Sequence, residues 1–369
     1  MSTSHMAPLG ALLLAGGTGQ RLWPLSRKNS PKQFAPLIGT KSSFQLAVER
    51  LAGSVPSERM YVATNRAYEA TLRSQAPALP SRNFILEPCR RDVAAAVALA
   101  FFTMEKDGVG GPFMFQWSDN YVKNTAALEQ AIATGRALVA ADPQRMVFIG
   151  EKPRYASENL GWIELDQKLG EHEGMPYYGF RSWQYRPPKA RCEDMLASGN
   201  FVWNSGYFVT TVEFMTNAFR TLAPELAARV EEIVQYRGTP QELSKLDELY
   251  PKVPSVHFDV AILERLPRSQ AVLLQVDLGW SDPGNLYSLK EALQTSSEAS
   301  VTRGDVIELG TKDSFIYNLT GDRLVAAMGL DGVIVVDTPE VLLVVHKDSV
   351  RHLGDLLKQI GEAGYERLL

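Results

Sequence analysis

A short segment near the start of the sequence holds residues well suited to bind an anion. Three glycines occur within four positions, at Gly16, Gly17 and Gly19. Such a run lets the backbone approach a ligand closely and point several N–H groups at it. Basic residues follow at once, and no acidic residue precedes Glu49, although the whole chain carries a formal net charge of −4. The segment therefore concentrates positive potential where we expect a polyanion to bind.

Two familiar phosphate-binding motifs do not fit this segment. A Walker A loop needs Gly-Lys-Ser or Gly-Lys-Thr at a fixed spacing after its first glycine, and the sequence has neither there. A dinucleotide-binding fingerprint needs a helix that begins at the third glycine, and Pro24 and Pro31 would interrupt that helix. A glycine turn with solvated basic side chains is the alternative for the glycines taken alone.

Two carboxyl groups further along the chain stand where a nucleotide could use them. Asp119 comes just after the apolar run Pro112–Trp117, and ligands of open α/β sheets bind at the carboxyl ends of strands. Such an aspartate can hold Mg²⁺, which prefers oxygen ligands. Glu87 ends another apolar run, and its carboxylate can accept two hydrogen bonds side by side. The alternative for Glu87 is an acid near the positive end of a helix dipole.

These residues need a scaffold, and the first two-thirds of the chain has the pattern of one. Apolar strand-like runs alternate with amphipathic helical stretches, which is typical of an α/β sheet. We expect strands at Gly10–Ala15, Arg59–Thr64, Asn83–Glu87, Pro112–Trp117, Met146–Gly150 and Val272–Gln275. We expect helices at Ser43–Leu51, Tyr68–Gln75, Ala94–Lys106 and Leu128–Ala141.

After about residue 300 the pattern changes. Short runs of valine, isoleucine and leucine are separated by Gly and Asp at roughly 10 to 17 residues, which indicates short strands arranged as the coils of a small β-helix. A final amphipathic helix is expected near Val350–Gly361. The predicted domains are therefore 7–295 and 296–369.

The bulk composition narrows the class of protein. The 369 residues are 45% hydrophobic and 22% charged, as in ordinary globular proteins, and exceed the usual size of a single core. No apolar run approaches the roughly 20 residues that span a bilayer. The net charge gives no sign of nucleic-acid binding, and the two cysteines form no disulfide framework. We expect a cytoplasmic protein that binds neither nucleic acid nor membrane.

The glycine-rich segment also resembles a family signature. From Gly16 to Lys32 it matches Gly-Gly-x-Gly-x-Arg-Leu-x-Pro-Leu-Ser…Pro-Lys, which is similar to the signature of sugar-1-phosphate nucleotidyltransferases. Trp23 and the continuation Lys32–Phe34 make it most similar to the mannose-1-phosphate guanylyltransferase family. The resemblance implies a Rossmann-like mixed-sheet nucleotidyltransferase domain over 7–295, followed by a small β-rich, left-handed β-helix-like domain over 296–369.

The same resemblance implies roles on the nucleotide side. The loop would wrap the triphosphate of GTP, Arg21 would stabilise charge on the α-phosphate and the leaving pyrophosphate, and Lys32 would lie over the reacting phosphoryl group. Asp119 and Asp282 would hold Mg²⁺, although an aspartate before Pro-Gly, as Asp282 is, is by itself typical of a turn. The implied nucleotide-binding residues are Ala15, Gly16, Gly17, Thr18, Gly19, Glu87, Pro88, Arg91 and Ser118.

On the sugar side the resemblance involves shorter matches. Asn204 and Gly206 belong to a Trp-Asn-Ser-Gly run of the family, and Gly161 to a segment similar to Gly-Tyr-Gly-Tyr-Ile, so all three would contact the sugar. Arg186 stands where the family has the lysine of Glu-Lys-Pro, and its guanidinium can still bind the sugar phosphate. Glu-Lys-Pro itself occurs earlier, at Glu151–Pro153, in a position that fits a different family segment. Asp259 is expected to orient a lysine or arginine of the site, or alternatively to be an acid at the start of a helix.

The resemblance implies an enzyme that joins GTP and a sugar 1-phosphate, mannose 1-phosphate by default, into a GDP-sugar and pyrophosphate. In-line attack on the α-phosphate would need positioning and charge neutralisation rather than a covalent nucleophile, and a homodimer is expected. Asn120 replaces a histidine of the family and Asp92–Val93 replaces Asn-Thr. These departures leave open a heptose, octose or pseudo-sugar 1-phosphate, or a regulatory paralogue that binds a nucleotide sugar without catalysis. A glycosyltransferase would want an Asp-x-Asp motif, which the sequence lacks.

Overall fold

The computed structural model describes residues 7–17, 20–27, 34 and 39–369. Contacts within the chain divide it into two compact units, each of which is discontinuous in sequence. The sheet unit comprises the described parts of Met1–Gly16, Ala47–Ser118 and Val122–Gly279. The β-helix unit comprises the described parts of Gly17–Leu46, Asp119–Tyr121 and Trp280–Leu369. The predicted boundary between residues 295 and 296 stays a prediction.

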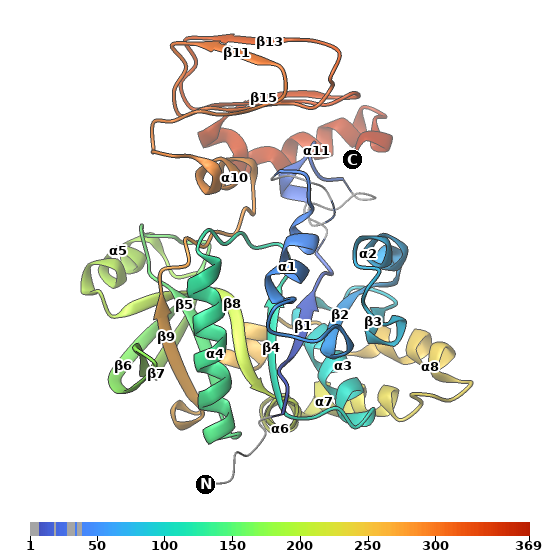
Figure 1. Ribbon diagram of the computed structural model, residues 1–369. Coiled ribbons are helices and arrows are strands. Elements are labelled where there is room, and N and C mark those ends of the chain that lie inside the picture. The colour runs from blue at the N-terminus through green and yellow to red at the C-terminus, as the bar shows by residue number, and fades with distance from the viewer. Residues whose placement is uncertain (1–6, 18–19, 28–33, 35–38) are drawn as a thin grey trace. The chain divides into compact units, whose positions relative to one another are not determined.

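The sheet unit is built on one mixed sheet (Figure 1). Its strand order within the described residues is β3-β2-β1-β4-β8-β5-β9-β7-β6. The strands are β1 (Gly10–Leu14), β2 (Met60–Asn65), β3 (Phe84–Glu87), β4 (Pro112–Trp117), β5 (Met146–Glu151), β6 (Gly161–His172), β7 (Met175–Tyr185), β8 (Phe201–Thr211) and β9 (Ala271–Val276). The pairs of β1 with β2 and β4, and of β2 with β3, are parallel, whereas β8 is antiparallel to both β4 and β5.

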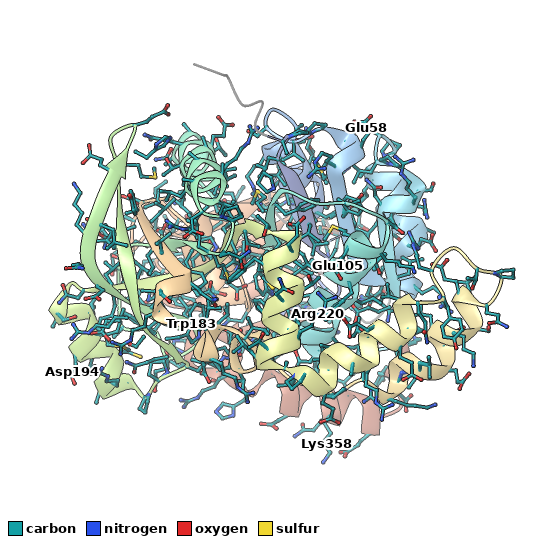
Figure 2. All side chains as sticks on the ribbon, turned by 90° about the horizontal axis from the view of Figure 1, so that it is seen from below. Glu58, Glu105, Trp183, Asp194, Arg220 and Lys358 are labelled. Carbon is teal, nitrogen blue, oxygen red and sulfur yellow. The ribbon has the colours of Figure 1, made fainter. Side chains whose placement is uncertain are left out.

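Helices cover both faces of this sheet. They are α1 (Ser43–Leu51), which belongs in part to each unit, α2 (Glu69–Gln75), α3 (Asp92–Lys106), α4 (Thr125–Ala141), α5 (Lys189–Ser198), α6 (Val212–Leu222), α7 (Pro224–Val234), α8 (Glu242–Leu249) and α9 (Phe258–Ala261). On one face, α3, α6 and α7 share a hydrophobic core with two paired strand residues, Phe148 of β5 and Phe208 of β8. An ion pair between Arg220 of α6 and Glu105 of α3, both labelled in Figure 2, has a shortest N–O distance of 2.6 Å.

The opposite face is covered by α4, and a glycine permits the close approach. A Cβ atom on Gly135 would lie 2.9 Å from Val209 Cγ2 and 3.6 Å from Val147 Cγ1. Because Val147 and Val209 precede or follow the core residues Phe148 and Phe208 by one position, their side chains point to the other side of the sheet. The helix therefore packs closely on the side chains of Val147 in β5 and Val209 in β8.

The β-helix unit contains short strands that pair in parallel between successive coils. These are β10 (Val301–Arg303), β11 (Val306–Leu309), β12 (Phe315–Asn318), β13 (Val325–Met328), β14 (Val333–Asp337) and the antiparallel β15 (Leu342–His346). Among the described residues β10, β12, β14 and β15 form one sheet, and β11 pairs with β13. The helices α10 (Leu286–Leu293) and α11 (Leu353–Glu362) contribute apolar residues to the same core as β12 and β14.

Residues from near the N-terminus complete the core of the β-helix unit. Leu22, Trp23 and Leu25 are buried together with residues of α10, β12 and β14. The indole N–H of Trp23 donates to the backbone oxygen of Leu368 at 2.7 Å. Leu22 and Trp23 directly follow Arg21, so the packing of these two side chains anchors the basic segment that the sequence singled out.

Most predicted elements are confirmed, and the α/β class with a β-rich C-terminal part is correct. The observed strands β1 to β5 and β9, the helices α1 to α4 and the terminal helix α11 agree with their predicted ranges within a few residues. The long hairpin of β6 and β7 was not predicted, because its second half carries polar residues without a clear alternation. In the described part of the chain no helix is long and apolar enough to cross a membrane.

A buried ionic cluster joins α10 to the coils of the β-helix unit. The ammonium group of Lys290, which is fully buried, donates to Asp313 Oδ1 and, at 2.6 Å, to Gln294 Oε1. Lys347 and the hydroxyl of Tyr287 also donate to the Asp313 carboxylate. Because each charge in this cluster has a partner, its burial is tolerated.

Replacement of Asp313 by Asn tests this cluster. The variant would leave Lys290 buried without a counter-charge, which costs about 3–5 kcal/mol in comparable cases. We expect the urea midpoint of unfolding, measured by circular dichroism, to fall clearly. Asp331→Asn is the control, because the pair of Asp331 with Lys312 is exposed and such pairs contribute about 0–1 kcal/mol. Equal midpoints for the two variants would contradict the prediction.

Candidate active site

The parallel strands of the sheet unit bring several predicted residues to one edge. Leu14 pairs with Ala63 of β2 and with Trp117 of β4, so the carboxyl ends of these strands lie in register. Beyond them, the backbone oxygen of Leu14 accepts hydrogen bonds from both the N–H and the hydroxyl of Ser118, at 3.1 and 3.0 Å. Ala15 is held by its N–H bond to Ala63, at 2.8 Å. The start of the glycine segment therefore has a fixed backbone.

Glu87, at the carboxyl end of β3, faces this same edge. A Cβ atom placed on Gly16 would lie 3.5 Å from Glu87 Oε1, so one carboxylate oxygen is adjacent to the glycine backbone. The other oxygen, Oε2, accepts a hydrogen bond of 2.6 Å from the hydroxyl of Tyr250. Only 7% of Glu87 is exposed, which makes it a buried carboxyl group at a predicted ligand site.

Burial controls the protonation of Glu87. Loss of water raises the pKa of its carboxyl group to about 7, although the hydrogen bond from Tyr250 and the positive charge of Arg90 act in the opposite direction. Perturbed acids of this kind gather at functional sites. The carboxyl group of Glu87 therefore changes its charge near neutral pH, the pH range in which a nucleotide would bind.

Pro88 and Arg91 lead from β3 into α3. Arg91 occupies the position before the first helical residue, and its Nε is buried without a hydrogen-bond partner among the described residues. A buried donor of this kind is normally satisfied, which suits a polar ligand at this helix start. Asp92 has a left-handed backbone (φ 61°), and its carboxylate accepts from the N–H of Val93 at 2.7 Å.

The predicted metal carboxylates both belong to the β-helix unit. Tyr121 and Ser281 form an antiparallel bridge with two backbone hydrogen bonds of 3.0 Å. Asp119 precedes this bridge by two residues on one segment, and Asp282 follows it by one on the other. In an antiparallel pair Asn120 lies opposite Asp282, and Asp119 is the next residue along, so the bridge brings together the two backbone segments that carry the aspartates.

Arg21 lies beside Asp282 in the same unit. Arg21 Nη2 and Asp282 Oδ2 are each 3.7 Å from the position that a Cβ atom on Gly284 would take. Gly17 is exposed and also belongs to this unit. Thr18, Gly19 and Lys32 lie outside the described residues.

The carboxylate oxygens of this region are suited to a hard cation that phosphate oxygens of a ligand would also bind. No group of three or more His, Cys, Asp or Glu side chains suited to a metal occurs in the part of the chain that was searched, namely the described residues. Mg²⁺ needs only one or two protein carboxylates when phosphate oxygens and water complete its shell. Asp119 and Asp282 match that requirement, and Gly284, which has no side chain, lies beside Asp282.

The predicted sugar-side residues also come together, within the sheet unit. A Cβ atom on Gly161 would lie 3.3 Å from Asn204 Cβ and 3.3 Å from the ring of Trp183 (labelled in Figure 2). Gly161 pairs with Tyr185, and the N–H of the next residue, Arg186, donates to Leu160 at 3.3 Å.

A bulge between β5 and β8 positions the polar residue Asn204 of this group. The register of β5 with β8 shifts beside Asn204, whose Oδ1 accepts from the N–H of Gly206 at 2.9 Å. Gly206 has a φ of 76°, which favours glycine. These contacts bring the four predicted sugar-side residues into one region of the sheet unit, namely Gly161, Arg186, Asn204 and Gly206.

A polar chain beside Arg186 was missed by the sequence prediction. The hydroxyl of Tyr185 lies 3.1 Å from His257 Nε2, and His257 Nδ1 lies 2.8 Å from Asp259 Oδ2. The hydrogen bond to Asp259 raises the pKa of His257, whereas burial and the charge of Arg186 lower it. Asp259 was expected to orient a lysine or arginine; within the described residues its partner is this histidine instead. The contact joins residues 72 positions apart, so no local pattern indicates it.

Glu151 has a structural position rather than a place in this group. Its side chain is fully buried, and its Oε2 accepts from the N–H of Leu278 at 2.8 Å, while Arg154 pairs with its other oxygen. These contacts hold the chain after β9. They agree with the expectation that Glu151–Pro153 is not the sugar-phosphate motif.

Comparison with known proteins agrees with this geometry. The family model for nucleotidyl transferases matches residues 10–299, and the model for the mannose phosphate isomerase/GMP-like β-helix domain matches residues 304–360. The chain belongs to the nucleotidyl transferase family. As a nucleotidyl transferase it is similar to mannose-1-phosphate guanylyltransferase 2 of Escherichia coli O157:H7, with 30% identity over 96% of this chain and 74% of the relative.

Two further similarities agree with this family. The xanthan biosynthesis protein XanB of Xanthomonas campestris pv. campestris (strain B100) is 31% identical over 97% of this chain and 74% of its own length. A solved structure from Thermus thermophilus, described as a mannose-1-phosphate geranyltransferase, superposes with a TM-score of 0.84 at 30% identity and covers 96% of this chain and 100% of its own. The family suggested by the glycine-rich segment is thus confirmed.

The raised pKa of Glu87 predicts how this nucleotidyl transferase loses stability with pH. An acid whose pKa is higher in the folded state than in the unfolded state binds its proton more tightly when folded. Its contribution is therefore present below the unfolded value of 4.5 and is lost as pH rises to about 7. The loss corresponds to about 3 kcal/mol at most.

We therefore expect Glu87→Gln to be more stable than the original protein at pH 8, and the difference to shrink at pH 5. Urea midpoints measured without nucleotide at both values check this. Glu58→Gln, which changes an exposed carboxyl group (Figure 2), is the control. A stability difference for Glu87→Gln that does not vary with pH would count against a buried, proton-binding Glu87.

Proposed function

We propose that this chain transfers the guanylyl group of GTP to a sugar 1-phosphate, and so makes a GDP-sugar and pyrophosphate. The main support is the similarity of nearly the whole chain, at 30–31% identity, to relatives that include a mannose-1-phosphate guanylyltransferase. Mannose 1-phosphate is accordingly the proposed acceptor. The proximity of Glu87 to Gly16 and of Arg21 to Asp282 supports the nucleotide half of the proposal.

Catalysis would rest on positioning and charge. Nucleotidyl transferases generally use a divalent metal, here proposed to be Mg²⁺, which Asp119 and Asp282 would hold and which would supply positive charge to offset that of the phosphates. Arg21, and Lys32 by the family resemblance, would stabilise negative charge on the α-phosphate and on the leaving pyrophosphate. Ser118 and the glycine backbone would orient the triphosphate.

The acceptor needs no protein base. A phosphate monoester has its second pKa near 6, so a sugar 1-phosphate is largely a dianion at neutral pH and can attack directly. The chain's task is to bring that oxygen in line with the α-phosphorus. We assign Arg186 to the acceptor phosphate, and Gly161, Asn204 and Gly206 to the sugar.

The family resemblance also supports a cytoplasmic homodimer as the working form. Light scattering coupled to size-exclusion chromatography would measure the mass in solution. A mass of one chain at working concentration would count against the dimer.

The first experiment measures pyrophosphate release. The purified chain with Mg²⁺ is given GTP, ATP, UTP or dTTP with mannose 1-phosphate or larger sugar 1-phosphates. We expect release with GTP and mannose 1-phosphate, and a loss of roughly 10²–10³ in kcat for Asp282→Asn, because a proposed ligand of the Mg²⁺ that offsets the phosphate charge is weakened. Asp322→Asn, at an exposed position of the β-helix unit, is the control. If pyrophosphate is released selectively with a heptose or octose 1-phosphate, that sugar phosphate is the acceptor instead of mannose 1-phosphate. If the chain binds a nucleotide sugar but releases no pyrophosphate, it is a regulatory protein.

The assignment of Arg186 predicts a selective effect on the acceptor. Arg186→Ala should raise the KM for the sugar 1-phosphate by about 10–100-fold, since a charge-assisted hydrogen bond is worth about 1.5–3 kcal/mol, and should leave the KM for GTP nearly unchanged. Arg186→Lys should recover part of the loss. Arg181→Ala is the control, because Arg181 lies on β7, the strand that Arg186 directly follows, and its side chain is 55% exposed. Equal effects on both KM values would remove Arg186 from the acceptor site.

A further inference from the structure

A buried tyrosine fixes the carboxyl group of Glu87. Tyr250 begins the 3-10 helix η6 (Tyr250–Lys252), which follows α8, and lies 163 residues from Glu87 in the sequence. Its hydroxyl oxygen is 2.6 Å from Glu87 Oε2. Tyr250 is fully buried within the hydrophobic core, so this contact is a polar link from the core to a site residue.

The direction of this hydrogen bond follows from the two groups. Burial, together with the negative charge of Glu87, raises the pKa of Tyr250 well above its usual value, so the phenol keeps its proton. It therefore donates to Glu87, and a donated hydrogen bond favours the ionised carboxylate. Arg90 acts on Glu87 in the same direction, while Arg91 and Cys89 are the other titratable groups that act on Tyr250.

The charge of Glu87 decides which purine can pair with it. An ionised carboxylate only accepts hydrogen bonds, which suits the N1–H and 2-amino group of guanine. A protonated carboxyl group offers one donor and one acceptor. That arrangement loses one guanine contact and matches the N1 acceptor and 6-amino donor of adenine.

Orientation matters as much as charge. The bond to Tyr250 holds Oε2 in the core, and Oε1 is the oxygen adjacent to Gly16. Each carboxylate oxygen has two lone pairs, so Oε2 can accept from Tyr250 and still accept from a base. Without the phenol, the carboxyl group would be both more easily protonated and free to rotate.

We propose that Tyr250 is a positioning residue that determines nucleobase specificity, because its phenol keeps Glu87 ionised and directed toward Gly16, where a guanine would be selected over an adenine. The inference rests on the proposed function in one respect, namely that Glu87 contacts the base. It assigns to a core tyrosine, far from the glycine segment in sequence, the choice between GTP and ATP.

The test compares Tyr250→Phe with the original full-length chain. Binding of GTP, ITP and ATP is measured from pH 6 to 9, together with kcat/KM for GTP and ATP. The ratio of GTP to ATP at each pH cancels the titration of the phosphates and of the acceptor. ITP lacks the 2-amino group and reports the loss of one contact to Glu87.

For the original chain we expect the GTP:ATP ratio to rise through a pH of about 7. In Tyr250→Phe the midpoint should move up by about one to two pH units, because a hydrogen bond to a charged group is lost. At pH 7 the ratio should then fall by about tenfold. Glu87→Gln should show a low ratio that does not vary with pH.

Tyr236→Phe is the matched control. Tyr236 is a partly buried tyrosine whose ring lies near Lys245, and its hydroxyl makes no part of the proposed site. Its GTP:ATP ratio and midpoint should equal those of the original chain. If Tyr250→Phe fails to fold, the profiles of the original chain and of Glu87→Gln still decide, since a ratio independent of pH in the original chain overturns the proposal.

The outcomes separate the two proposals. If the original chain prefers GTP but Tyr250→Phe has the same ratio and midpoint, Tyr250 only packs in the core and the inference is wrong. If the original chain shows no preference for GTP over ATP and UTP at any pH, the proposed guanylyl transfer fails first. A midpoint that moves in Tyr250→Phe alone supports the inference.

Discussion

The parallel pairing of β1, β2, β3 and β4 is the constraint on which the nucleotide half of the site depends. Parallel strands in register end at the same edge of a sheet, so residues that directly follow them meet there whatever their distance in sequence. Gly16 and Glu87 are adjacent for this reason, and Ser118 is bonded to the end of β1. The buried apolar strands determine where this edge lies, and the residues just beyond them can be polar and can bind a ligand.

Two buried carboxyl groups show how the chain separates stability from function. Asp313 accepts from Lys290, Lys347 and Tyr287, and despite the opposing effect of burial the pKa of its carboxyl group is lowered. Glu87 has one such donor, Tyr250, and burial raises its pKa to about 7. The first group is fully paired and stabilises the β-helix unit. The second has fewer donors within the described residues, and its burial costs stability while its carboxylate can still accept from a ligand.

Local patterns in the sequence were sufficient to predict the strands that end at the site. The apolar runs before Gly16, Glu87 and Asp119 each become a strand because an alternating or fully apolar run has few other ways to be buried. The glycine-rich segment was also enough to indicate the family. These predictions succeeded because each depends on residues within about 20 positions of one another.

Contacts between distant segments could not be predicted in this way. Tyr250 reaches Glu87 across 163 residues, and nothing near Tyr250 distinguishes it from an ordinary core tyrosine. Trp23 was noted for its family pattern, but its packing in the β-helix unit depends on Leu368, 345 residues away. The hairpin of β6 and β7 escaped notice because its outer half is polar, so its strands are specified by pairing with each other rather than by burial.

The acceptor side shows how one chemistry can be kept while its residues change. The family places a carboxylate next to a lysine, whereas this chain has Tyr185 next to Arg186. The carboxylate of Asp259 reaches Tyr185 through His257. The group beside Arg186 in the sequence is thus a hydroxyl, which can donate as well as accept. If Arg186 holds the sugar phosphate as proposed, its neighbour in the sequence is a hydroxyl rather than a carboxylate, so the proposed acceptor side differs from the family pattern in the hydrogen bonds that it can make.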